Sequence, residues 1–375
     1  MQNAGTTSTD VKKVNRNRIF RMIYQEGSLS KQNIVQALNI SLPTVVQNLR
    51  VLTERGLVRE EGSFASTGGR KARAISCNPA ARFSIGMDIT KKHVVLVAID
   101  LCASVTKNKR IYMPFKNSKE YFRELGKELE EFIQGLQIDQ SRILGVGISV
   151  PGLLSEDHRQ VVYAPVLGFT GGSLSSFAEF IPYTCILIND ASAAALAELW
   201  NFNEAENVVY LSLSSSVGGA ISLGKTFYHG DNQRSAEFGH MTIVPGGRRC
   251  YCGQSGCLDA YCNANILSDS ADGSLDGFFK LLASGSLQHQ GLWKEYLNYL
   301  ALAVNTLRMS FDSRVILGGY VGSHMEHTIA SFRNQVSLLN SFETDGSYLD
   351  VCRFKLESSA VGAALQHIEL FIDSI

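Results

Sequence analysis

Three cysteine thiols lie within eight residues in the segment CYCGQSGC, which runs from Cys250 to Cys257. Gly253 and Gly256 allow the backbone between the thiols to turn sharply. Such a cluster is compatible with a bound metal ion, a disulfide or a redox centre. Cys250 and Cys252 are separated by one residue, so they pair poorly as a disulfide but can both bind one ion. The spacing alone leaves the three alternatives open.

The composition is that of a globular protein in water. Of 375 residues, 45% are hydrophobic and 19% are charged, and a chain of this length is expected to form two or three domains. No apolar run approaches the roughly 20 residues needed to span a bilayer, and the N-terminal segment has no apolar signal region. We therefore expect a cytoplasmic protein that has reduced thiols and no membrane partner.

The charges are unevenly distributed along the chain, although the formal net charge is zero. Residues 1–80 contain twelve Lys and Arg against five Asp and Glu, a net charge of +7, and the remainder carries −7. A basic segment attached to an acidic one indicates that only the basic segment contacts a polyanion. We therefore predict a DNA-binding domain over residues 1–80 and a second domain over residues 81–375.

Residues 1–80 have the pattern of a helix-turn-helix. A first helix ends at Gly27, a short second helix begins after Ser30, and a third begins after Ser41 and ends at Gly56. In this motif the last helix lies in the major groove. Apolar residues at i, i+4 and i+7 predict its buried face, and Gln and Asn can pair with adenine edges. The side chains that we expect to face DNA are Thr44, Gln47, Asn48 and Arg50.

Beyond Gly56 the sequence predicts two short strands around a tip rich in glycine and serine. Arg70 and Lys71 lie on the returning strand, where a wing contacts the phosphate backbone. The alternative is a solvated basic hairpin on a winged helix that contacts protein. The charge and the polar helix face favour DNA.

After Arg82 the pattern changes to apolar strands mixed with helices, which indicates the α/β class. Residues 83–101 predict a hairpin, with Asp88 at the end of its first strand. Residues 185–200 predict a strand that enters an alanine-rich helix at Asn189 and Asp190. Residues 207–224 predict a second hairpin, with its turn at Gly218-Gly219. Further predicted elements are strands at 143–154 and 314–318 and a closing helix at 358–372.

This arrangement resembles the ROK family, which comprises repressors, uncharacterised reading frames and sugar kinases. The most specific part of the resemblance is the cysteine cluster with EFGH upstream, residues 237–240. The resemblance covers the whole chain and implies a winged helix-turn-helix followed by a two-lobed, actin-like (ribonuclease-H-like) ATPase fold. A winged-helix head on such a body is similar to the repressor branch, whose members regulate xylose, glucose and N-acetylglucosamine genes.

The resemblance also implies a sugar site. Asn189 and Asp190 match the family's Asn-Asp pair, and Glu237 and His240 match its Glu-x-Gly-His, which holds ring hydroxyls. Asp259 stands where the family normally has Glu, one methylene longer. Carboxylate, amide and imidazole groups together suit a polyol. These five residues are therefore expected to bind a sugar or a sugar phosphate.

For the cysteine cluster the resemblance implies a ligand set. His240, Cys250, Cys252 and Cys257 follow the family's ligand order, and four such ligands with no open position suit a structural, tetrahedral Zn²⁺. The metal would hold one imidazole nitrogen of His240 while the other faces the sugar.

The phosphate loops of the family's kinases are altered in this sequence. The opening Asp-x-Gly-x-Thr loop is Asp88-Ile89-Thr90-Lys91-Lys92, and the Gly-Thr-Gly of the second loop is Ser214-Ser215-Ser216. Glycine lets backbone N–H groups crowd onto a phosphate, which other residues hinder.

We therefore predict a sugar-responsive repressor with no catalytic residues, which binds operator DNA as a homodimer or homotetramer. The alternative is an ATP-dependent sugar kinase with an accessory head, which the retained Asp190 favours. A regulator whose body binds a protein partner is a third class.

Overall fold

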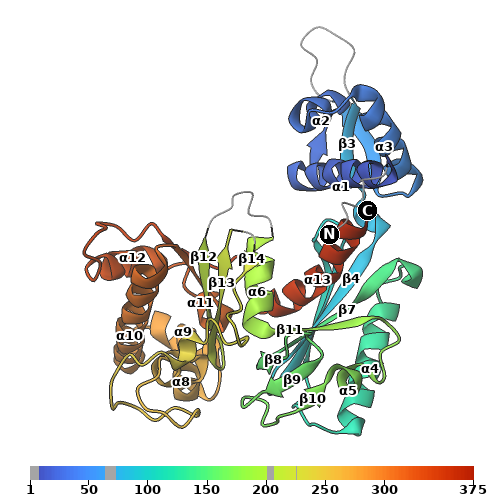
Figure 1. The fold of residues 1–375 in the computed structure, drawn as a ribbon. Helices are drawn as coiled ribbons and strands as arrows, with labels where there is room; N and C mark the ends of the chain where they lie inside the picture. The colour runs from blue at the N-terminus through green and yellow to red at the C-terminus, as the bar shows by residue number, and fades with distance from the viewer. Residues whose placement is uncertain (1–7, 64–72, 201–206, 225) are drawn as a thin grey trace.

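The computed structural model describes residues 8–63, 73–200, 207–224 and 226–375. A small head sits on a two-lobed body, and the C-terminus lies where head and body meet (Figure 1). Within the described residues, no helix is both long enough and apolar enough to cross a membrane. Arg70 and Lys71 lie outside the described residues, so their predicted role stays a prediction.

The head is the predicted winged helix-turn-helix. Ser30 accepts a hydrogen bond from the backbone N–H of Asn33 and begins the second helix, and Ser41 caps the third helix in the same way. A three-stranded antiparallel sheet, in the order β1-β3-β2, covers the helices. The elements are α1 (Ser8–Glu26), β1 (Ser28–Leu29), α2 (Lys31–Leu38), α3 (Leu42–Glu54), β2 (Val58–Ser63) and β3 (Arg73–Cys77).

The first lobe is built on a five-stranded mixed sheet. The order is β11-β7-β4-β5-β6, in which β4, β5 and β6 are antiparallel and β7 and β11 join in parallel. A small sheet, β10-β9-β8, lies beside it. The elements are β4 (Phe83–Ile89), β5 (His93–Asp100), β6 (Val105–Tyr112), α4 (Lys119–Gln134), β7 (Ile143–Val150), β8 (Leu153–Leu154), β9 (Gln160–Tyr163), β10 (Gly172–Ser173), α5 (Leu174–Ala178) and β11 (Cys185–Asn189).

The second lobe repeats this strand arrangement. Its sheet has the order β14-β13-β12-β15-β16, again with an antiparallel meander and two parallel additions. The elements are β12 (Val208–Leu213), β13 (Val217–Leu223), β14 (Thr226–Phe227), α7 (Asp259–Cys262), α8 (Ala264–Ser268), α9 (Leu275–Ala283), α10 (Leu287–Phe311), β15 (Arg314–Gly318), α11 (Gly319–Gly322), α12 (Ile329–Ser337) and β16 (Leu349–Val351).

Two helices run between the sheets, α6 (Asp190–Leu199) and α13 (Ser358–Ser374) (Figure 1). They approach so closely that a Cβ added at Gly362 would lie 1.7 Å from the carbonyl oxygen of Ala193. On its other side α13 lies equally close to the first sheet, where a Cβ at Gly86 would lie 1.7 Å from the carbonyl oxygen of Ala360. Small residues therefore allow α13 to make close backbone contacts with α6 on one side and with the first sheet on the other.

The predicted turn at Gly218-Gly219 is wrong. Both glycines lie inside β13, and the turn of the hairpin is Ser214–Ser216, between the paired residues Leu213 and Val217. A Cβ at Gly219 would lie 2.3 Å from the ring of Phe238. The glycine there provides room for an aromatic ring and makes no turn.

Candidate functional site

A cavity of 540 Å³ lies between the two lobes. The first lobe contributes the turn after β7 and the β8–β9 hairpin, and the second contributes β13 and residues 227–237. His158, Gln233 and Ala236 line this cavity. Their φ angles are positive, which is uncommon for residues other than glycine. Backbone strain of this kind concentrates at functional sites.

The first pair of predicted sugar ligands lies deep in this cavity. Asn189 ends β11 and caps α6: its amide oxygen accepts from the Ser192 N–H at 3.0 Å, and its amide nitrogen donates to the Gly152 carbonyl at 3.1 Å. Asp190, in the first turn of α6, presents its carboxyl group to the cavity. Burial and the neighbouring Asp88 raise the pKa of Asp190 to about 7. At neutral pH this carboxyl group can both donate and accept hydrogen bonds.

Glu237 and His240 line the same cavity from the second lobe. His240 ends a short 3-10 turn, Phe238–His240, and its Nε2 lies 3.3 Å from the hydroxyl of Tyr251, which also lines the cavity. Tyr251 was not predicted, because in the sequence it only separates Cys250 from Cys252. Four of the five predicted sugar residues thus meet in one cavity.

Two further histidines border the cavity from opposite lobes. His158, in the β8–β9 hairpin, and His229, after β14, have ring centroids 6.3 Å apart. Neither belongs to a recognisable motif, so no sequence signal marks them. Their rings add two flat, polar imidazole groups to the predicted sugar residues that line the cavity.

Asp259, the fifth predicted sugar ligand, does not line the cavity. It is 3% exposed, and its carboxylate accepts from the backbone N–H of Val217 at 2.6 Å and from the side chain of Asn263. Its shorter side chain is used to hold the start of β13. The prediction is corrected: Asp259 is a structural neighbour of the site.

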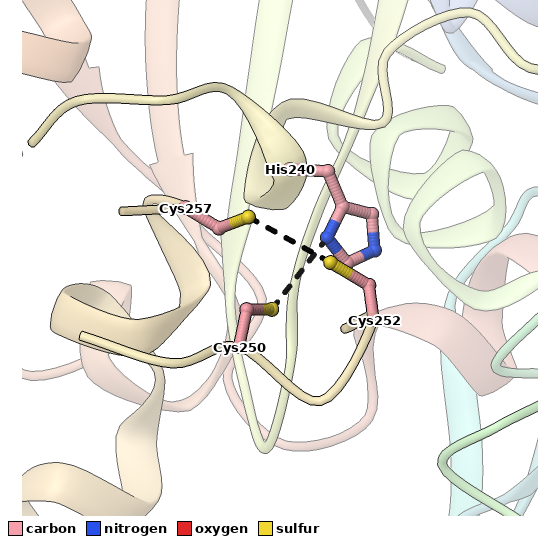
Figure 2. Close-up of side chains that lie close together, drawn as sticks. All are labelled: His240, Cys250, Cys252 and Cys257. Atoms are coloured by element: carbon pink, nitrogen blue, oxygen red, sulfur yellow. Dashed lines mark hydrogen bonds between the residues drawn. The ribbon is translucent and has the colours of Figure 1, made fainter. Parts of the chain in front are cut away.

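The predicted metal ligands converge on one point. The ligand atoms of His240, Cys250, Cys252 and Cys257 all lie within 4.8 Å of one another (Figure 2). Cys252 Sγ and Cys257 Sγ are 3.7 Å apart, and Cys250 Sγ is 3.8 Å from His240 Nδ1. Tetrahedral zinc with Zn–S bonds of about 2.3 Å places two sulfurs about 3.8 Å apart. The four side chains therefore fit one tetrahedral Zn²⁺ ion.

The exposed face of α3 differs in one residue from its prediction. Gln47 and Arg50 are exposed, with Arg50 paired to Glu54 at 2.7 Å, and Thr44 is half-buried. Asn48 is only 4% exposed, and its side chain donates to the Thr44 carbonyl. Its predicted outward orientation is wrong because Asn48 lies on the buried face of the helix.

Comparison with known proteins explains why these features occur together. The model of the ROK family matches residues 84–368. The chain belongs to the ROK family.

Relatives of this ROK protein match over almost its full length. It is 25% identical to the DNA-binding transcriptional dual regulator NagC of Escherichia coli, over 94% of this chain and 92% of the relative. It is also 25% identical to the xylose repressor of Bacillus subtilis, over 98% of each protein.

Solved ROK structures establish the fold. A ROK family transcriptional regulator described as a homolog of the E. coli MLC protein superimposes with a TM-score of 0.76 at 21% identity, covering 97% of each chain. A ROK family glucokinase from Streptomyces griseus, with glucose and AMPPNP, gives 0.63 at 22% identity, covering 76% of this chain and 98% of the other. The fold is therefore a winged helix-turn-helix head on the two-lobed, actin-like ROK body.

In the two segments that stand where the family's kinases have phosphate loops, several groups are bonded to other protein groups. Thr90 Oγ1 donates to the carbonyl of His93 at 2.9 Å and tightens the β4–β5 turn. Next to the second loop, at the start of β13, the Val217 N–H donates to Asp259, and within the loop the Ser214 carbonyl accepts from the Ala264 N–H at 2.7 Å.

Proposed function

We propose that this ROK protein is a cytoplasmic, sugar-responsive repressor of carbohydrate-utilisation genes. The observation that carries the proposal is the match to repressors over head and body together, since the kinases among the solved structures match the body alone. A sugar in the cavity would alter operator affinity to the extent that it binds two conformations unequally.

The head supplies a surface suited to the major groove. Gln47 and Arg50 are the exposed polar residues at its centre, and Val46 and Leu42 beside them are 45% and 49% exposed. Gln pairs with adenine, and an apolar side chain contacts the thymine methyl group. Two heads related by a two-fold axis would read a nearly palindromic operator, so we propose a homodimer or a dimer of dimers.

The cavity supplies groups suited to a polyol. Asn189, Asp190, Glu237 and His240 offer amide, carboxyl and imidazole groups that pair with hydroxyls. The amide of Asn189 is already fixed by Gly152 and Ser192, so its position is set before a ligand enters. Fixed polar groups reduce the entropy lost on binding.

Zinc at the four-ligand cluster would stabilise the fold of residues 240–257. His240, Cys250, Cys252 and Cys257 would fill all four positions, which is typical of structural zinc. With Nδ1 directed toward the cysteines, His240 keeps Nε2 beside Tyr251 at the cavity. The protein residues, and not the metal, would contact the sugar.

A sugar kinase is the second candidate, and one observation favours it. A carboxyl group whose pKa is about 7, such as that of Asp190, is well suited to accept a proton from a hydroxyl group. Against it, the Val217 N–H, directly after the second loop, already donates to Asp259 and is not available to a phosphate.

The test begins with operator fragments that the full-length protein selects from a random DNA pool. Their dissociation constants are measured with and without D-xylose, D-glucose, N-acetylglucosamine and the phosphate esters of each. We expect at least one sugar to change the dissociation constant in the wild type, and Asp190→Ala to abolish this response. Sugar-dependent ATP turnover that disappears in Asp190→Asn would contradict the proposal and support the kinase.

A further inference from the structure

A hydrogen bond joins the head to the end of α6 in the body. The indole N–H of Trp200 donates to the hydroxyl oxygen of Tyr24 at 2.8 Å, and the two rings meet edge to face with centroids 6.2 Å apart. Tyr24 lies on α1 of the head, and Trp200 directly follows α6. Burial raises the pKa of Tyr24, so its hydroxyl remains a neutral acceptor.

The other end of α6 lies in the sugar cavity. Asn189 caps the helix and Asp190 occupies its first turn, and both line the cavity. Ten residues of α-helix span about 15 Å. One short helix therefore begins among the proposed sugar ligands and ends against the head.

The middle of α6 is built to move as a unit. Its alanines are buried, and Ala193 lies against Gly362 of α13 at backbone contact. Alanine has the highest helix propensity and no side chain that can repack. Two longer side chains near the end of the helix, Leu196 and Glu198, are buried, and the Glu198 carboxylate accepts hydrogen bonds from the backbone N–H groups of Arg353 and Phe354. A displacement at its first turn is therefore carried to Trp200 without being absorbed by side-chain rearrangement.

A second observation links the same two places. A smaller cavity of 180 Å³ between head and body is lined by Tyr24, Trp200, Phe227 and Gln366, among others. Phe227 and Gln366 also line the sugar cavity. A single layer of side chains thus separates the sugar cavity from the contact between head and body.

We propose that the Tyr24–Trp200 pair is the joint through which α6 couples occupancy of the sugar cavity to the orientation of the DNA-binding head. This inference rests on the proposed function. Tyr24 and Trp200 would act as positioning residues: a shift of α6 moves Trp200 against Tyr24, and α1 carries α3 with it because both helices share the head's core.

The test uses full-length protein, selected operator DNA and the sugars named above. The measured quantity is the ratio of the operator dissociation constants with and without saturating sugar. Tyr24→Phe and Trp200→Phe should each move this ratio about threefold to tenfold toward one, the effect of one hydrogen bond. The double variant should add little, because both changes remove the same interaction. Sugar binding to the free protein, measured calorimetrically, should be retained.

A matched control lies on the exposed side of the same contact. Arg21 of α1 pairs with Asp373 of α13, and the side chains of Arg21 and Asp373 are 37% and 59% exposed. Asp373→Asn removes this ion pair without touching α6, and exposed pairs contribute little. The ratio should stay at the wild-type value.

A further measurement leaves the joint intact. The chain has two tryptophans, so Trp293→Phe makes Trp200 the sole indole, and its emission should change on sugar saturation. The inference is contradicted if operator binding of the wild type depends on sugar but the ratio is unchanged in both Tyr24→Phe and Trp200→Phe. It is also contradicted if the Trp200 emission does not change at saturating sugar. Either result would overturn the inference but leave the proposed function standing. A wild type whose operator binding responds to no sugar would overturn both.

Discussion

Asp190→Asn should make the protein more stable at alkaline pH. Burial and Asp88 raise the pKa of Asp190 to about 7, whereas its ordinary value is 3.8. Between these values the folded protein binds more protons than the unfolded chain, so its free energy of unfolding falls as the pH rises through this window. Asparagine does not titrate, so the free energy of unfolding of the variant does not fall in this way.

The magnitude follows from the two pKa values. Integrated from pH 5 to pH 8, the Asp190 shift corresponds to a loss of about 3 kcal/mol. Asp190 is only partly shielded from solvent, so screening reduces this difference to about 2 kcal/mol. The difference in free energy of unfolding between Asp190→Asn and the wild type should therefore grow by about 2 kcal/mol from pH 5 to pH 8.

The assay is urea unfolding of both proteins at pH 5, 6.5 and 8, followed by tryptophan emission. Asp272→Asn is the matched control, because Asp272 is exposed and its left-handed backbone also suits asparagine. This control should follow the wild type at every pH. If the stability of Asp190→Asn runs parallel to that of the wild type from pH 5 to pH 8, Asp190 is ionised normally and the reasoning fails.

Three further predictions concern the metal and the DNA. Cys252→Ser should lose zinc, measured by elemental analysis, and weaken the sugar response, because His240 and Tyr251 lose their support. Gln47→Ala should weaken operator binding by about 1–3 kcal/mol and relax the preference for one base pair, as seen in binding to mutated operators. Arg70→Ala with Lys71→Ala should weaken binding to all sequences and reduce the salt slope by about 2.

Each of these predictions has an outcome that contradicts it. Wild-type protein that contains no zinc would contradict the proposed metal centre. As a control, Cys185→Ser should keep its zinc because Cys185 lies in the first lobe. Unchanged base preference in Gln47→Ala would mean that α3 does not read bases through this side chain. An unchanged salt slope in the double variant would exclude the wing from phosphate contact.

The features that the sequence predicted well are those with local causes. Ser30 and Ser41 bond to backbone N–H groups three residues ahead, so their capping can be recognised from the adjacent residues alone. The strand that leads into α6 at Asn189 and Asp190 has a similarly local signal. Asn48 had such a signal too, since it lies three residues after Val45 and four before Leu52 and therefore shares their buried face.

The features that the sequence did not predict depend on residues distant in the chain. Asp259 is held by the N–H of Val217, 42 residues earlier, and no spacing rule anticipates that bond. His158 and His229 meet only because two lobes face each other. The glycines of β13 resemble a turn in the sequence, but Gly219 is needed because Phe238 packs against it.

The contact of α13 with α6 and with the first sheet determines how the lobes can move. Helices normally interlock through ridges of side chains that fit into grooves, and such ridges resist sliding. At Gly362 and Gly86 the backbones touch with no side chain between them. Such a contact opposes separation of the lobes, because a gap would remove close atomic contacts. It has no interlocking side chains that would oppose sliding of the backbones along each other. Closure of the lobes around a ligand should therefore proceed by sliding along α13, and a single methyl group added at Gly362 should block this movement.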